Sequence, residues 1–140
     1  MKSDFKNAYE RHQKDAEILF DKKRYANADH LYGLAAECAL KAVMVGLDPA
    51  LANQDGDLVN QGDKKHIDKL WGHFRLFLSG RNAPTYLAHV SNSNPFSNWR
   101  IEDRYANQKT FIKINVLPHK QALGSSVANL VAHARSQGKL

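Results

Sequence analysis

The feature that most limits the fold is a stretch from about Tyr25 to Gly46, which is apolar on almost every side if it is helical. Its apolar residues recur at alternating steps of four and three, which is the spacing of an α-helix rather than a strand. They are Leu31, Ala35, Cys38, Ala42 and Val45. A helix that is apolar all round is normally central to its fold, so we predict a buried helix over 25–46. Gly46 and the following Pro49 predict its end.

The segment before this helix predicts an amphipathic partner over residues 3–22, with Ser3 as the residue that caps its first turn. Its apolar face is formed by Phe5, Tyr9, His12, Ala16 and Leu19. Only a short basic connection, Asp21 to Arg24, separates the two segments. A connection this short predicts that the two helices pack as an antiparallel hairpin.

The rest of the chain predicts further helices. After a loop over 49–63, Asp63 is expected to cap a third helix over 64–79, and Pro84 to open a short helix carrying Leu87 and Val90. A polar loop over 91–98 follows, and a last helix is predicted from Pro118 to about Gln137. Residues 98–115 fit either a helix near 100–110 or an extended piece at 110–114. We therefore predict one all-α domain over 1–140, an up-and-down bundle of four to five helices.

Composition and charge limit the kinds of partner. Hydrophobic residues make up 43% and charged residues 24% of 140, as in globular proteins. The net charge of +6 favours anionic partners, although a solvated basic surface explains it equally well. Basic residues are densest at 22–24 and 64–66. No apolar run approaches the roughly 18 residues of a membrane span, no apolar signal core follows Met1, and Cys38 is the lone cysteine. We expect a cytoplasmic protein with no membrane association.

A polar stripe on the central helix is the first candidate for function. His30, Gly33, Glu37 and Lys41 share one face, and Glu37 and Lys41 can pair at the i,i+4 spacing. Such a pair is usually a solvated ion pair. On a central helix, however, charge is costly unless it faces a groove or a partner. Cys38 lies on the apolar seam, so we interpret it as a packing residue.

A second candidate lies between Trp99 and Tyr105. The guanidinium of Arg104 can bind phosphate and the ring of Tyr105 can stack on a base, whereas the alternative is a structural Arg–Asp network around Trp99. The chain has no P-loop, GxGxxG, CxxC, HExxH or GxSxG motif. The run Asp55–Gly56–Asp57 fails the EF-hand spacing. We therefore predict no cofactor and no metal.

Two motifs resemble the HEPN family of nucleotide- and RNA-associated helical domains. In the second helix, Ala36–Glu37–Cys38–Ala39–Leu40–Lys41–Ala42 is similar to the family pattern of Ala, Glu, a small or apolar pair and Leu-Lys-Ala. His66, ahead of Ile67 to Trp71, resembles the His that opens the family's next element. The resemblance covers about residues 5–78. It implies a helical bundle, often a homodimer.

The family includes metal-independent ribonucleases and non-catalytic nucleotide-binding modules, the latter often partnered with a nucleotidyltransferase. Its ribonucleases carry Arg, four to six residues, then His, late in the domain. Arg24 and His30 have that spacing but lie early, and neither Arg100 nor Arg104 is followed by such a His. We therefore expect a nucleotide- or RNA-binding accessory module rather than a nuclease.

The ligand-binding residues that we expect to converge on one groove are Glu37, Lys41, His66, Arg104 and Tyr105. The expected partners are nucleotide or RNA, a second copy of the chain, and a nucleotidyltransferase or a toxin/antitoxin partner. Two alternatives stay open. One is a metal-independent ribonuclease of a toxin or defence system that uses Arg24 and His30, and the other is a purely structural partner-binding subunit.

Overall fold

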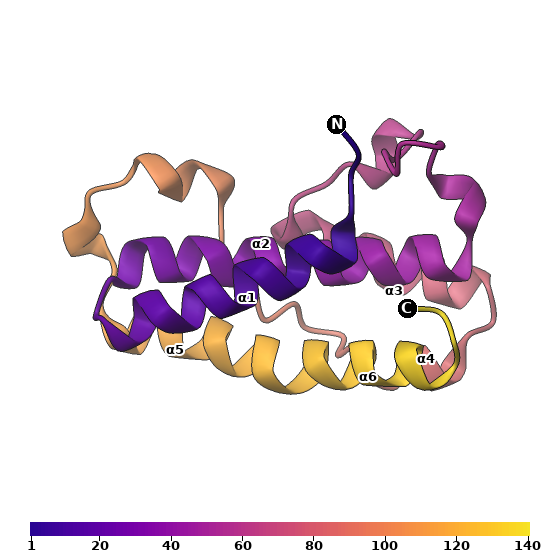
Figure 1. Ribbon diagram of the computed structural model, residues 1–140. Coiled ribbons are helices and arrows are strands. Elements are labelled where there is room, and N and C mark those ends of the chain that lie inside the picture. The colour runs from indigo at the N-terminus through magenta and orange to yellow at the C-terminus, as the bar shows by residue number, and fades with distance from the viewer.

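The computed structural model describes residues 1–140 and is built from helices and turns around a central helix (Figure 1). That helix, α2 (Tyr25–Leu47), packs along α1 (Phe5–Asp21) as an antiparallel hairpin. By length and composition alone α2 is apolar enough to cross a membrane, contrary to the expectation that no such run exists. However, 61% of its most apolar window is buried inside the bundle. The predicted central helix is confirmed, and it extends one residue beyond Gly46.

The remaining helices are α3 (Ile67–Gly80), α4 (Pro84–Leu87), α5 (Lys113–Ala122) and α6 (Ala128–Ser136). Three of them pack against the other sides of α2, and the short α4 packs against α3 and α6. A π-helical turn over Leu123–Val127 joins α5 to α6, and the three form one continuous rod along the bundle (Figure 1). One hydrophobic cluster of 27 buried residues draws on every one of these helices. The predicted all-α bundle of four to five helices is confirmed.

The start of α1 differs by one residue from the prediction. Asp4 caps the helix, because its carboxylate accepts a hydrogen bond from the backbone N–H of Asn7 at 2.9 Å. Ser3 forms hydrogen bonds with the 49–63 loop instead. Its backbone N–H donates to the carbonyl of Asp55 at 2.7 Å, and its hydroxyl donates to Asp57. These two hydrogen bonds hold the segment before α1 against the 49–63 loop.

The start of α3 is also later than predicted. His66, rather than Asp63, occupies the cap position, and its side chain makes no capping hydrogen bond. Asp63 is buried, and its carboxylate lies 2.7 Å from Nε2 of His73. This pairing takes the carboxylate away from the helix end, which explains why the cap prediction is wrong.

The last helix begins at Lys113, five residues before the predicted start at Pro118. Pro118 lies inside it, where proline removes one backbone hydrogen bond. The carbonyl left without that donor belongs to Ile114, and both residues are on the exposed side of the helix. Water can therefore replace the missing bond. Before this helix, the segment left open by the sequence forms two short 3-10 turns, Ile101–Tyr105 and Gln108–Thr110.

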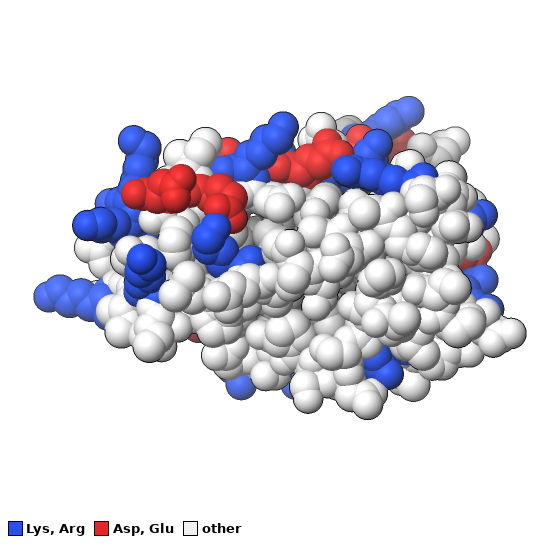
Figure 2. All heavy atoms as spheres, turned by 90° about the horizontal axis from the view of Figure 1, so that it is seen from below, with Lys and Arg blue, Asp and Glu red and all other residues white.

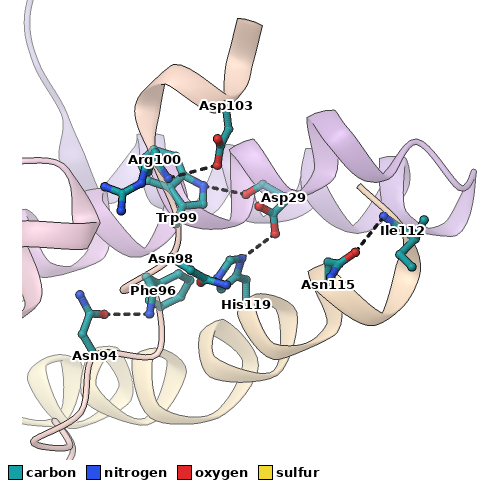
Figure 3. Close-up of polar contacts among 10 residues, drawn as sticks. All are labelled: Asp29, Asn94, Phe96, Asn98, Trp99, Arg100, Asp103, Ile112, Asn115 and His119. Atoms are coloured by element: carbon teal, nitrogen blue, oxygen red, sulfur yellow. Dashed lines mark hydrogen bonds and ion pairs between the residues drawn. The ribbon is translucent and has the colours of Figure 1, made fainter. Parts of the chain in front are cut away.

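A buried polar cluster holds the irregular segment, residues 99–111, against α2 and α5 (Figure 3). The indole N–H of Trp99 donates to the backbone carbonyl of Asp29 at 3.0 Å, and the ring is fully buried. The ring lies so close to Gly33 that a Cβ there would stand 2.1 Å from it. On the neighbouring side, His119 places Nδ1 2.6 Å from the Asp29 carboxylate and Nε2 2.8 Å from the Asn98 amide oxygen. These contacts position residues 99–111 over one end of α2.

Candidate functional site

The side chain of Glu37 connects three of the predicted site residues. It is 7% exposed, and its Oε1 accepts a hydrogen bond from Nζ of Lys41 at 2.7 Å. Its Oε2 lies 3.0 Å from Nδ1 of His66, which stands at the start of α3. The ammonium of Lys41 also lies 5.9 Å from the centre of the Phe5 ring. The structure thus brings Glu37, Lys41 and His66 together, and we call them the Glu37 cluster.

The cluster holds one imidazole in a usable orientation. A carboxylate beside Nδ1 favours the form of the ring that carries the proton there. Nε2 of His66 is then left free to accept a hydrogen bond or a proton. The side chain of His66 is 47% exposed, so a ligand can reach it. Glu37 therefore acts as a positioning residue, and Lys41 balances its buried charge.

Two further imidazoles lie beside the Glu37 cluster. Burial lowers the pKa of His30, the nearby charge of Arg104 lowers it further, and the charge of Asp29 opposes this. Burial also lowers the pKa of His12, followed by the charge of Arg11. Both rings are consequently neutral near pH 7. The sequence assigned His12 only to the core face of its helix, because periodicity does not reveal what a half-buried imidazole faces.

An aromatic wall extends from these histidines. The ring of His30 stacks on Trp99 with centroids 5.7 Å apart and an interplanar angle of 18°. The ring of His66 lies 6.4 Å from Trp99 on another side. Nδ1 of His30 is buried and has no hydrogen-bond partner. Along α2, imidazole and indole rings therefore connect the Glu37 cluster with the end of the helix that carries Asp29.

A basic cavity of about 400 Å³ lies at that end of the molecule. Its walls come from the turn after α1, the first turn of α2 and the irregular segment over 103–111. Four cationic side chains line it, namely Lys23, Arg24, Arg104 and Lys109. None of the four forms an ion pair with a carboxylate. In Figure 2, basic side chains gather, beside a smaller group of acidic ones, at the end of the molecule where Figure 1 places the turn between α1 and α2.

No protein-family model, curated protein or solved structure matches the chain. The two places on α2 therefore have to be interpreted from their own chemistry.

The predicted residues divide between these two places. Arg104 lines the basic cavity, and its guanidinium lies 4.8 Å from the ring of Tyr105, which is 77% exposed. The Glu37 cluster lies farther along α2, since Tyr25 of the cavity and Glu37 are separated by about 18 Å of helix. No hydrogen bond or ion pair joins Arg104 to the cluster. His30 lies between them, close enough to Arg104 for its pKa to respond.

The pair with ribonuclease-like spacing does not converge. Arg24 is the N-cap of α2 and lines the basic cavity, whereas His30 packs against Trp99 outside it. Among the residues not singled out from sequence, Lys109 and Phe111 also line the cavity. They belong to the segment whose conformation the sequence left open. The basic run at 22–24 and the predicted phosphate-binding residue Arg104 were the sequence signals for this site.

Proposed function

We propose that this protein binds a nucleotide or RNA without cleaving it, as an accessory or partner subunit. The observation that carries the proposal is the basic cavity, where four cations face one hollow and none is paired with a carboxylate. Four cations around one hollow with a single carboxylate residue, Asp103, among them repel one another, and a bound phosphate reduces that repulsion. The resemblance of residues 24–42 and 66–71 to the HEPN family supports the same class of ligand.

The roles of the predicted residues follow from their positions. Arg104 holds phosphate, and the exposed ring of Tyr105 beside it offers a face for a base. Nε2 of His66 accepts a hydrogen bond from a base or a ribose hydroxyl. Glu37 orients His66, and Lys41 contributes charge behind them. A ligand that contacts both the basic cavity and the Glu37 cluster has to extend over about 18 Å of α2.

The proposal includes a homodimer. Two copies of a chain with net charge +6 repel each other, so a dimer needs a face without charge. The face shown in Figure 2 is largely uncharged across its centre. The rod of α5 and α6 also carries exposed uncharged residues, namely Gln121, Gly124, Ser125, Asn129 and Ala132. Light scattering of wild type and of Ala132→Glu tests the dimer, since a buried carboxylate at a two-fold interface would dissociate it.

A metal-independent ribonuclease is the second candidate function. The hydrogen-bonded pair of Glu37 and His66 favours it, because a half-exposed imidazole with a free Nε2 has the properties of a general base. Against it stands the separation of Arg24 from His30. Incubation of single-stranded and structured RNA with the protein in EDTA distinguishes the two functions. We expect intact RNA; cleavage that disappears in Arg24→Ala, His30→Ala or His66→Ala would replace our proposal with this one.

Binding itself is tested by fluorescence anisotropy with labelled single-stranded RNA and with labelled ATP. We expect an affinity that falls steeply with salt, because cations of the protein replace counterions of the ligand. If neither probe bound at low salt, the proposed function would be refuted, and a structural partner-binding subunit would be the remaining interpretation. Co-purification with a nucleotidyltransferase or an antitoxin-like protein would identify the partner.

A further inference from the structure

The shape of the basic cavity separates two kinds of ligand that the proposed function leaves open. Its volume of about 400 Å³ falls in the range of pockets that enclose one small molecule. Strand binding along an RNA backbone instead uses a groove that follows several nucleotides. A hollow of this size accommodates the phosphates of a single nucleotide.

The charge in the cavity is dense. Lys23, Arg24, Arg104 and Lys109 provide four positive charges and Asp103 one negative charge, which leaves a net charge of +3. The carboxylate of Asp103 is partly occupied, because it accepts a hydrogen bond from the backbone N–H of Arg100 at 3.3 Å. An internal RNA phosphate carries one charge, whereas a nucleoside di- or triphosphate carries several within a few ångströms. The cavity therefore matches a polyphosphate better than it matches a strand.

Backbone donors add to these cations. Arg24 is the N-cap of α2 and its side chain caps nothing, so the first-turn amides of Tyr25, Ala26 and Asn27 have no acceptor within the helix. All three of these residues line the cavity. The dipole of the 23-residue helix also favours a negative charge at this point. The cavity thus offers both fixed amide donors and mobile cationic donors to one anion.

Two aromatic rings complete the lining. Tyr25 belongs to α2 and Phe111 to the irregular segment. The ring of Tyr25 is held in place by an edge-on contact with Phe20, with centroids 5.4 Å apart. A ring fixed in this way presents a face or edge to a base without an entropic cost for ordering it.

From these observations we propose that the basic cavity binds the di- or triphosphate of a single nucleotide, with the base packed against Tyr25 or Phe111. This rests on the proposed function for the class of ligand, and it adds the ligand's size and its position. The phosphates contact Arg24, Arg104 and Lys109 and approach the first-turn amides of α2. RNA then binds elsewhere along α2 or competes only through its terminal phosphates.

Isothermal titration of the full chain with ATP, ADP, adenosine and inorganic tripolyphosphate tests the proposal. We expect ATP and ADP to bind, tripolyphosphate to compete with them, and adenosine to bind at least about tenfold more weakly, since charge-assisted hydrogen bonds dominate. The variant Arg24→Ala/Lys109→Ala is expected to weaken ATP binding at least about thirtyfold. Tyr25 stays intact in this variant, so the core is not disturbed.

The matched control is Lys14→Ala/Lys64→Ala, which removes the same charge from exposed lysines outside the cavity and should bind ATP like wild type. Lys23→Glu provides a second cavity variant, with circular dichroism as the check of folding. Equal loss of ATP binding in the control and cavity variants would overturn the proposal. If a 5′-hydroxyl RNA 10-mer binds, while ATP neither binds nor reduces the binding of that RNA, this inference is overturned but the proposed function is preserved. If neither ATP nor the RNA binds, both this inference and the proposed function are overturned.

Discussion

The contact between Gly33 and Trp99 makes the sharpest stability prediction. Alanine is normally the better helix residue, so Gly33→Ala alone should raise the free energy of unfolding by about 1 kcal/mol. Here the added Cβ would lie 2.1 Å from the indole ring, which is fully buried and hydrogen-bonded to Asp29. The ring has to leave its place, at a cost comparable to the loss of a buried Trp, about 3–5 kcal/mol. The net expectation is a loss of about 2–4 kcal/mol.

Urea denaturation followed by circular dichroism measures this effect. The matched control is Gly72→Ala in α3, because nothing lies within 4 Å of a Cβ at that position. That variant should gain about 1 kcal/mol. In a Trp99→Ala background the clash is absent, so Gly33→Ala should become stabilising there. The reasoning is refuted if Gly33→Ala stabilises the wild-type protein as Gly72→Ala does, or costs the same with and without the indole.

Three further predictions concern buried or half-buried side chains. His119→Ala should lower the free energy of unfolding by about 3–5 kcal/mol in urea denaturation, because it leaves the buried Asp29 carboxylate unpaired; an effect below about 1 kcal/mol would contradict this. Since the pKa of His30 is lowered, the unfolded chain binds the proton more readily, so this residue's contribution to stability is present above pH 6.5 and lost as pH falls below it. The melting temperature of His30→Gln should depend less on pH between 7.5 and 5.5 than that of wild type, and an identical dependence would exclude this role. Burial raises the pKa of the Cys38 thiol to about 11, so a disulfide reagent at pH 8 should react slowly with native protein and rapidly in urea; fast native reaction would contradict it.

The parts of the fold that the sequence predicted well are those governed by periodicity. The hairpin of the first two helices follows from apolar steps of three and four and a connection of a few residues. The helix ends were less predictable, because the side chains of Asp63 and Ser3 bond to residues 10 and 54 positions away in the sequence. Pro118 was misleading because its missing hydrogen bond falls on the solvent side of the helix, which no local pattern records.

The candidate site also has contacts that sequence spacing predicts and contacts that it does not. Glu37 and Lys41 pair within one helix, so their contact follows from spacing alone. His66 joins them from another element, and its position had to be taken from the family resemblance. The basic cavity was beyond prediction, since Lys109 reaches it only through the 3-10 turns of a segment without periodicity. The charges of Arg24 and Arg104 were evident in the sequence, whereas the cavity that both residues line was not.

The fastening of the irregular segment to α2 also bears on the order of folding. The first two helices meet through a short turn, whereas Asp29 meets Trp99 and His119 across 70 and 90 residues of chain. Closing such long loops is slow, so the hairpin should form first and the cavity last. A ligand that contacts both Arg24 and Lys109 would connect the early half of the chain to the late half. It should therefore slow amide hydrogen exchange most around residues 99–111, acting on the opening of that segment more than on the hairpin itself.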